Sequence, residues 1–300
     1  MFKGAGKHSV NSNVHEYWQL AKPRIVGMVL VTAATGFFVG GSGLHDFHRW
    51  ILLAVTLLGT GLAAAGAAIL NNYLERDTDA RMERTRLRAL PAGRIEPAAA
   101  LALGVVLVLA GVSLLAAAVN LLAAFLVLLT AFLYVLVYTP LKKVTWLNTP
   151  IGAIPGALPP MVGWAAATDN LDPGAWILFG ILYLWQHPHF YAIAWMYRDD
   201  YRAAGYKMLS VIDPTGRRVF RQAILFSLAL IPVSIALTWL GLAGQTYLIG
   251  AVFLGSALLA ASLHFAQHQQ RADARRVLLA SVVYLPLLLI LIVLDAGFAR

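Results

Sequence analysis

Asn71, Glu75 and Asp79 stand four residues apart in a segment that directly follows a long, almost wholly apolar run. If the helix formed by that run continues, these side chains lie in one row, because residues four apart share a helical face. The row would extend to Glu83, and neighbouring like charges at this spacing destabilise a helix. A divalent cation removes the conflict, since carboxylate and amide oxygens are ligands that Mg²⁺ accepts. The pattern indicates a Mg²⁺ site, with a solvated, charged helix end as the alternative.

A second row beside the first carries cationic side chains. Asn72, Arg76 and Arg84 share this neighbouring face, and a guanidinium group presents the planar fork that suits phosphate oxygens. Because Mg²⁺ keeps several waters, proteins usually bind it through a few carboxylates together with a substrate phosphate. The two rows together therefore indicate a site for a metal ion and a diphosphate.

The element that must position these rows is a membrane helix. The chain has 300 residues, of which 60% are hydrophobic and 12% are charged. A soluble domain cannot bury that much apolar surface, whereas a bilayer supplies an apolar solvent. Apolar runs of sufficient length predict an all-α, polytopic transmembrane helical bundle of about nine helices. The predicted spans lie near residues 25–42, 50–70, 98–118, 120–138, 150–167, 174–196, 219–240, 246–264 and 277–295.

The basic residues predict the orientation of these spans. With a cytoplasmic N-terminus, every Lys and Arg except Arg49 and Arg300 falls in a cytoplasmic segment, and such asymmetry sets topology. We expect a multi-pass protein of the bacterial cytoplasmic (inner) membrane, in contact with membrane lipids, with a periplasmic C-terminus. Residues 1–300 are expected to form one membrane domain with a cytoplasmic tail at 1–20. This placement explains the net charge of +9 without nucleic acid, and the absence of cysteine excludes thiolate chemistry.

Two further groups of residues lie at the ends of spans. Tyr138 and Lys142 close the fourth span, where an interfacial anchor is the simpler interpretation. In the sixth span His189 follows Pro188, at which a kink is expected. An intramembrane histidine is more often a packing residue, and the alternative is a ligand of heme iron. His189 and Asp200 are separated by close to three helical turns, so they would share a face of one continuous helix.

The first acidic segment resembles that of the intramembrane prenyltransferases of the UbiA superfamily. Asn71, Asn72, Glu75 and Asp79 match the family's motif, except that Glu75 stands where aspartate is usual. The resemblance implies a UbiA-type prenyltransferase fold and a Mg²⁺ ion, held by this motif, that carries an isoprenoid diphosphate. The residues for which the resemblance implies substrate contacts are Arg24, Asn72, Arg76, Arg84, Tyr138, Lys142, His189 and Tyr201.

The sixth span narrows the resemblance to the branch of the superfamily that farnesylates heme. The matching pieces are Trp185–Gln186–x–Pro188–His189–Phe190 and Asp200–Tyr201–x–x–Ala204–Gly205–x–x–Met208–Leu209. Aromatic prenyltransferases of the superfamily usually carry a second aspartate pair at the positions of Tyr197 and Tyr201. A lighter second metal site is therefore expected, with Asp200 as its ligand because Asp200 would share the face of His189.

This branch implies a definite reaction. The farnesyl group of farnesyl diphosphate would be transferred to a vinyl group of heme b, with Mg²⁺ as the cofactor, to give heme O. Heme A synthase or the terminal oxidase assembly system would be the partner that receives the product. The nearest alternative is prenylation of 4-hydroxybenzoate, a quinone precursor or a chlorin. A transporter is disfavoured, because transporters carry polar or broken segments near the bilayer midplane, whereas the acidic residues here cluster at span ends.

Overall fold

The computed structural model describes residues 10–41 and 46–298, and it is helical throughout this part of the chain apart from turns and short connections. The elements are α1 (Val10–Leu20), α2 (Pro23–Gly40), α3 (Phe47–Asp79), α4 (Pro97–Ala118), α5 (Leu121–Phe132), η1 (Leu133–Tyr138), α6 (Thr139–Leu141), α7 (Asn148–Ala157), α8 (Pro159–Thr168), α9 (Pro173–Met196), α10 (Arg198–Ala203), α11 (Leu209–Ile212), α12 (Arg217–Trp239), α13 (Gln245–His268) and α14 (Arg271–Phe298). The short element η1 is a π-helix that joins α5 to α6. The prediction of an all-α protein is confirmed.

Seven helices in the described residues are long and apolar enough to cross a membrane. They are α2, α3, α4, the continuous segment α5–η1–α6, α12, α13 and α14. The predicted fifth span is divided into α7 and α8 at Leu158. The sixth is the single helix α9, in which Gln186, His187 and His189 lower the hydropathy. The chain is a multi-pass membrane protein, and the count of nine spans stays a prediction.

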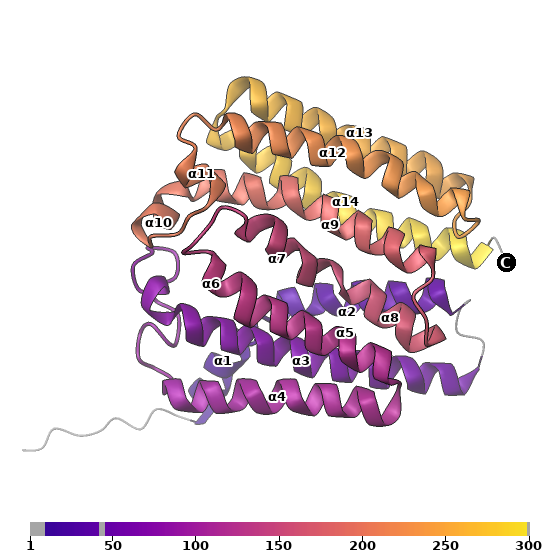
Figure 1. The fold of residues 1–300 in the computed structure, drawn as a ribbon, viewed down its shortest axis with the longest axis horizontal. Helices are drawn as coiled ribbons and strands as arrows, with labels where there is room; N and C mark the ends of the chain where they lie inside the picture. Colours follow the sequence, from indigo (N-terminus) through magenta and orange to yellow (C-terminus); the bar gives the residue numbers. More distant parts are fainter. Residues whose placement is uncertain (1–9, 42–45, 299–300) are drawn as a thin grey trace, which may run out of the picture.

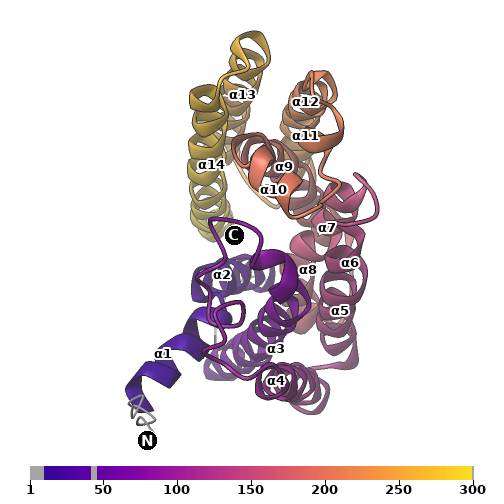
Figure 2. The same cartoon turned by 90° about the vertical axis from the view of Figure 1, so that its left-hand side faces the viewer.

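The long helices lie side by side with their axes roughly aligned (Figure 1) and form a ring when viewed along those axes (Figure 2). Helix α2 contacts both α3 and α14, so the beginning and the end of the chain meet in the ring. Helix α9 packs against α7, α12 and α14. The short helices α6, α10 and α11 gather at one end of the bundle, at the left of Figure 1, together with the turns that follow α3. The polar motifs therefore meet at that end.

Small residues hold α3 tightly against α4. A Cβ atom on Gly66 would lie 2.6 Å from the carbonyl oxygen of Gly104 and 2.8 Å from the backbone nitrogen of Val108. Gly59 of α3 faces Gly111 of α4 in the same way, about two helical turns from Gly66 and Gly104. In lipid, small residues allow helix backbones to approach closely, and dispersion contacts then replace the missing hydrophobic driving force. This packing fixes the axis of the helix that carries the acidic row.

The turns of residues 80–96 cover the end of α3. Leu90 and Ile95 pack in one apolar cluster with Ile69 of α3 and Leu20 of α1. Residues 10–20 of the expected tail thus form α1, while residues 1–9 lie outside the described residues. The expectation that the acidic row extends to Glu83 is wrong, because α3 ends at Asp79 and Glu83 lies exposed in the turns.

Candidate active site

The acidic row at the end of α3 is buried. Asn71, Glu75 and Asp79 are 1%, 6% and 2% exposed, and they occupy successive turns of one helical face. A carboxylate removed from water needs a partner, since an isolated buried charge is strongly unfavourable. The alternative of a solvated, charged helix end is therefore wrong for these three residues, and the partners of each define the site.

Glu75 is held by a lysine and a tyrosine from two other parts of the chain. The Lys142 ammonium lies 2.7 Å from Glu75 Oε1, and the Tyr206 hydroxyl donates to the same oxygen at 3.1 Å. The Lys142 ammonium also lies 4.5 Å from the centre of the Tyr138 ring. The sequence-predicted residues Glu75, Lys142 and Tyr138 thus meet, and Tyr206 joins them.

Asp79 is held by the turns that follow α3. Arg88 Nη1 donates to Asp79 Oδ2 at 2.8 Å, and the Thr85 hydroxyl donates to the Asp79 backbone carbonyl at 2.8 Å. Thr85 is itself buried. Because Arg88 is bound to one carboxylate oxygen only, the guanidinium fork keeps further donors for another anion.

Asn71 connects α3 to the starts of α2 and α6. Its amide nitrogen donates to the Thr139 hydroxyl at 2.9 Å, and the Thr139 hydroxyl donates to the Tyr134 carbonyl at 2.8 Å. This chain of donors orients the amide so that Asn71 Oδ1 accepts from the Lys22 ammonium at 2.6 Å. Lys22 adopts a left-handed backbone conformation with φ of 51° between α1 and α2. Strained backbone of this kind is concentrated at functional sites, and here it aims the lysine at Asn71.

The π-helix η1 sets the register of the residues after it. A π-helical turn contains more residues than an α-helical turn, and such turns occur frequently at functional sites. The Tyr134 carbonyl accepts the backbone N–H of Thr139, five residues later. Gly152 of α7 leaves room for the Tyr138 ring, because a Cβ there would collide with it. Gly152 therefore has a steric role beside the site.

The backbone of Lys142 also positions Tyr206. The Lys207 N–H donates to the Lys142 carbonyl at 2.7 Å, and the Asn148 side-chain amide donates to the Lys207 carbonyl at 3.3 Å. Gly205, with φ of 76°, makes the turn that precedes Tyr206. These contacts tie the loop after α10 to the end of α6, so Tyr206 and Lys142 reach Glu75 together.

The two lysines of the site differ in basicity. Burial lowers the pKa of Lys22 to about 8, although the nearby Glu75 carboxylate acts in the opposite direction. Burial also lowers the pKa of Lys142, but the contacting Glu75 carboxylate and the surrounding tyrosine side chains together outweigh burial and hold that pKa well above its ordinary value. Both lysines are protonated at neutral pH, so the described site holds the cations Lys22, Arg88 and Lys142 against the carboxylates of Glu75 and Asp79.

Arg84 and Asp200 lie in a neighbouring cavity of about 320 Å³. The residues lining it are Glu83, Arg84, Met196, Tyr197, Asp199, Asp200 and Arg271. The Arg84 guanidinium lies 4.7 Å from the Tyr197 ring centre and 5.9 Å from that of Tyr201. The Tyr201 ring lies 6.0 Å from that of Tyr206, so Tyr201 connects this cavity to the Glu75 side of the site.

The helix that was expected to join His189 to Asp200 is interrupted. Helix α9 ends at Met196, Tyr197 leaves the helical conformation with φ of −116° and ψ of 26°, and α10 begins at Arg198. The two residues therefore do not share a face of one helix, and that reason for preferring Asp200 over Asp199 is wrong. Asp199 is instead paired with Arg202 at 2.7 Å.

His189 faces α14 and has one nitrogen free. Ser281 Oγ donates to the Leu278 carbonyl at 2.7 Å, so it accepts from His189 Nδ1–H at 2.8 Å. This assigns the tautomer and leaves a lone pair on Nε2, which has no hydrogen-bond partner among the described residues. The ring stacks on Trp185 with 5.2 Å between the centres. A hydrogen bond that fixes one imidazole nitrogen and leaves the other free is the arrangement found in metal-ligating histidines.

His187 likewise has Nδ1 bound and Nε2 without a partner, but it is packed more tightly than His189. It is fully buried, its Nδ1 lies 2.6 Å from the Tyr183 carbonyl, and its ring stacks on Phe226 with 3.6 Å between the centres. Its environment is therefore that of a packed core side chain.

Two of the residues expected to contact substrate have other contacts, and a third lies exposed. Asn72 donates to the Leu20 carbonyl at 2.9 Å, and Arg76 donates to the Tyr73 carbonyl at 2.9 Å. Arg24 is exposed on the first turn of α2. The sequence did not assign roles to Lys22, Arg88 and Tyr206.

Known proteins resemble this chain in sequence. The sequence profile described as "UbiA prenyltransferase family" matches residues 29–287. A relative from Solibacter usitatus (strain Ellin6076), named protoheme IX farnesyltransferase, is 44% identical over 291 residues, covering 94% of this chain and 99% of the relative. The expected resemblance is thus confirmed over nearly the whole chain.

Solved structures share the fold. A structure of digeranylgeranylglyceryl phosphate synthase in membranes superposes with a TM-score of 0.80 at 16% identity, covering 96% of this chain and 99% of that one. A UbiA homologue from Archaeoglobus fulgidus bound to GPP and Mg²⁺ gives a TM-score of 0.63 at 15% identity, covering 92% and 99%. On the matched profile and the relative together, the chain belongs to the UbiA prenyltransferase family.

Proposed function

We propose that this protein transfers the farnesyl group of farnesyl diphosphate to a vinyl group of heme b and thereby forms heme O. The Solibacter usitatus relative named protoheme IX farnesyltransferase supports the choice of donor and acceptor. The Archaeoglobus fulgidus homologue bound to GPP and Mg²⁺ supports a prenyl diphosphate and a divalent cation as ligands of this fold.

The observation that carries the proposal is the buried row of oxygen donors with cations on both sides. Asn71, Glu75 and Asp79 offer amide and carboxylate oxygens on one helical face, which is the donor set that Mg²⁺ accepts. In the protein alone, lysine and arginine side chains neutralise these carboxylates. The residues therefore fit a Mg²⁺ ion. A bound Mg²⁺ would displace the lysine and arginine side chains from the carboxylates, and these side chains would remain nearby to bind an anion.

Lys22, Arg88 and Lys142 would then bind the diphosphate oxygens. They approach the row from the start of α2, from the turns after α3 and from the end of α6, and each contacts a different residue of the row. When bound, Mg²⁺ would supply positive charge that stabilises the departing diphosphate. The three cations would stabilise the same charge, since they carry more positive charge than the two carboxylates cancel.

The reaction needs no strong general base from the protein, because only one proton is released. The allylic C–O bond of farnesyl diphosphate breaks, the farnesyl carbon bonds to the terminal vinyl carbon of heme b, and diphosphate leaves. Water adds its oxygen to the remaining vinyl carbon and releases one proton. The aromatic rings of Tyr138 and Tyr201 border this site and would help to exclude other water from the allylic cation.

His189 is proposed as the ligand that orients the acceptor. Its Nε2 lone pair is directed by the Ser281 hydrogen bond on Nδ1, and a neutral imidazole is a common axial ligand of heme iron. Asp200 and Arg84 would complete the metal and diphosphate site from the neighbouring cavity.

The proposed setting is the bacterial cytoplasmic membrane, with the site at the cytoplasmic ends of the spans and the C-terminus in the periplasm. The distribution of basic residues supports this orientation. Residues 1–300 would act as one membrane domain, and heme A synthase or a terminal oxidase assembly system would receive the product.

A reconstituted assay tests the proposal. The purified protein in vesicles is supplied with labelled farnesyl diphosphate, Mg²⁺ and one acceptor, either heme b, 4-hydroxybenzoate or a chlorin. We expect label in heme O only, loss of product after chelation and recovery on return of Mg²⁺. Labelled 4-hydroxybenzoate or chlorin with no heme product would refute the proposal and favour another prenyltransferase of the same fold.

A further inference from the structure

A basic cavity of about 640 Å³ lies beside the one that contains Asp200, between the ends of α9 and α14. Its lining is Met196, Arg271, Ala272, Arg275, Arg276 and Leu279, and it shares Met196 and Arg271 with the smaller cavity. The smaller cavity is lined by three carboxylates, whereas the larger one is lined by arginine and apolar side chains only. Such a lining suits an anionic group carried on an apolar body.

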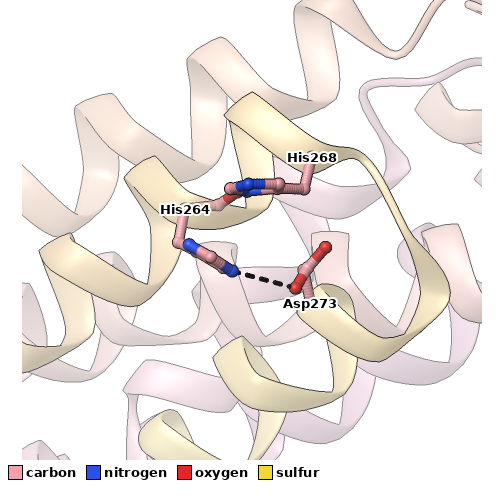
Figure 3. A group of neighbouring side chains, drawn as sticks. All are labelled: His264, His268 and Asp273. Carbon is pink, nitrogen blue, oxygen red and sulfur yellow. Dashed lines mark hydrogen bonds and ion pairs between the residues drawn. The ribbon is translucent and has the colours of Figure 1, made fainter.

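One of the three arginines already has a counter-ion. Arg276 Nη1 lies 2.8 Å from Asp273 Oδ1, and Asp273 is 3% exposed. His264 Nε2 lies 3.2 Å from the same oxygen, and Figure 3 shows this pair with His268 at the junction of α13 and α14. The charge of Arg276 is thus neutralised by Asp273 within the protein.

Arg271 and Arg275 have no carboxylate within ion-pair distance in the part of the chain that the structure describes. They stand four residues apart at the start of α14, and both are exposed. Like charges at this spacing destabilise a helix. A helix N-terminus is also an unfavourable place for cations. A ligand with two anionic groups would relieve both effects.

The position of these arginines relative to His189 points to the identity of that ligand. Met196 lies seven residues after His189 on α9, hence on the same face and about 10 Å along the axis. Arg275 precedes Ser281, the hydrogen-bond partner of His189, by about 9 Å along α14. The separation for Arg275 is comparable with that between the iron of a porphyrin and the ends of its propionate side chains, and Arg271 lies one turn beyond Arg275, about 15 Å from Ser281 along the axis.

We propose that Arg271 and Arg275 bind the two propionate carboxylates of heme b. The inference rests on the proposed function, because it assigns a subsite to the acceptor of that reaction. The arginines would hold the carboxylates at the membrane surface while the macrocycle extends along α9 and α14 toward His189. Heme b would thereby be fixed in one orientation relative to the diphosphate.

The test uses heme b and its dimethyl ester, in which both carboxylates are masked. Binding to the full-length protein in neutral phosphatidylcholine vesicles is followed through the Soret band, and farnesylation is measured in the same samples. We expect the parent to bind heme b at least about tenfold more tightly than the diester. The variant Arg271→Gln/Arg275→Gln should bind both porphyrins about equally. Arg221→Gln, an exposed arginine on α12 at the same end, is the matched control.

Equal binding of heme b and diester by the parent would overturn the inference, and so would a variant that keeps the full preference. A variant effect that appears only in vesicles with phosphatidylglycerol, and equally for both porphyrins, would assign the arginines to lipid headgroups instead. Preferential binding of heme b without farnesylation would refute the proposed function and leave the propionate subsite standing.

Discussion

Replacing Lys142 with methionine would leave the buried Glu75 carboxylate with a hydroxyl donor and no touching cation. Lys142 Nζ lies 2.7 Å from Glu75 Oε1, and the side chains are 15% and 8% exposed. At an effective dielectric constant of about 20, charges this close attract by about 6 kcal/mol. Desolvation offsets much of this attraction, and removing one partner of a buried pair costs about 3–5 kcal/mol. Because Tyr206 still donates to Glu75, we expect a loss near 3 kcal/mol.

A double-mutant cycle separates this stability effect from catalysis. Lys142→Met and Glu75→Gln are made singly and together, and unfolding by SDS in mixed micelles is measured without ligand. The double variant removes both charges, so it should be more stable than the sum of the single losses by about 2 kcal/mol. With Mg²⁺ and farnesyl diphosphate, each single variant should lose activity about 100-fold. The double variant should not regain it, because both groups are needed once the ligands separate them.

Two results would contradict this reasoning. A coupling energy below about 0.5 kcal/mol would mean that the two groups do not neutralise each other in the ligand-free protein. Parental activity in the double variant would remove both residues from the substrate site. Lys143→Met is the control, because Lys143 is the exposed neighbour and should change stability by no more than about 0.5 kcal/mol.

The remaining predictions concern the other parts of the site. Asp79→Ala should lower farnesylation about 100-fold or more and remove its dependence on Mg²⁺ concentration, as measured in vesicles with heme b. Gly152→Ala should push the Tyr138 ring out of place and raise the KM for farnesyl diphosphate with a smaller change in stability. Ser281→Ala should free the His189 ring, shift the Soret band of bound heme b and weaken its binding about tenfold. His189→Ala should abolish the spectral signature of imidazole ligation.

The Asp79, Gly152 and His189 variants each have a matched control or a contradicting result. Asp77→Ala controls for Asp79, because Asp77 is exposed on the same turn of α3. Gly27→Ala controls for Gly152, because a Cβ on Gly27 meets nothing within 4 Å. Parental Mg²⁺ dependence in Asp79→Ala would refute the metal assignment. Identical Soret bands for the parent and the His189 variant would refute the iron assignment.

Helical periodicity located the acidic row, because the apolar run before Asn71 and the four-residue spacing are both local properties. It did not predict that the row is buried. Burial comes from turns after α3, from α1 and from the loop after α10, and these meet only in the folded bundle. For the same reason, Arg88 and Tyr206 could not be assigned from their spacing to Glu75 and Asp79.

The first and sixth spans illustrate a second limit. Lys22 and Arg24 flank Pro23, and hydropathy does not show which of the two enters the site. The left-handed backbone conformation of Lys22 directs the lysine to Asn71. At the end of α9, counting turns placed His189 and Asp200 on one face. The count failed because Tyr197 interrupts the helix, and no proline or glycine marks that position in the sequence.

The π-helical turn of Leu133–Tyr138 has a consequence for how this scaffold can diversify. Removing one residue from it would rotate everything that follows by about 100° relative to the helix before it. Other side chains would then take the places of Tyr138 and Thr139 beside Asn71, while α3 and its row of oxygen donors stayed unchanged. Because Lys142 also follows this turn, a single-codon deletion or insertion there would change, in one evolutionary step, both the wall beside Asn71 and the cation that meets Glu75.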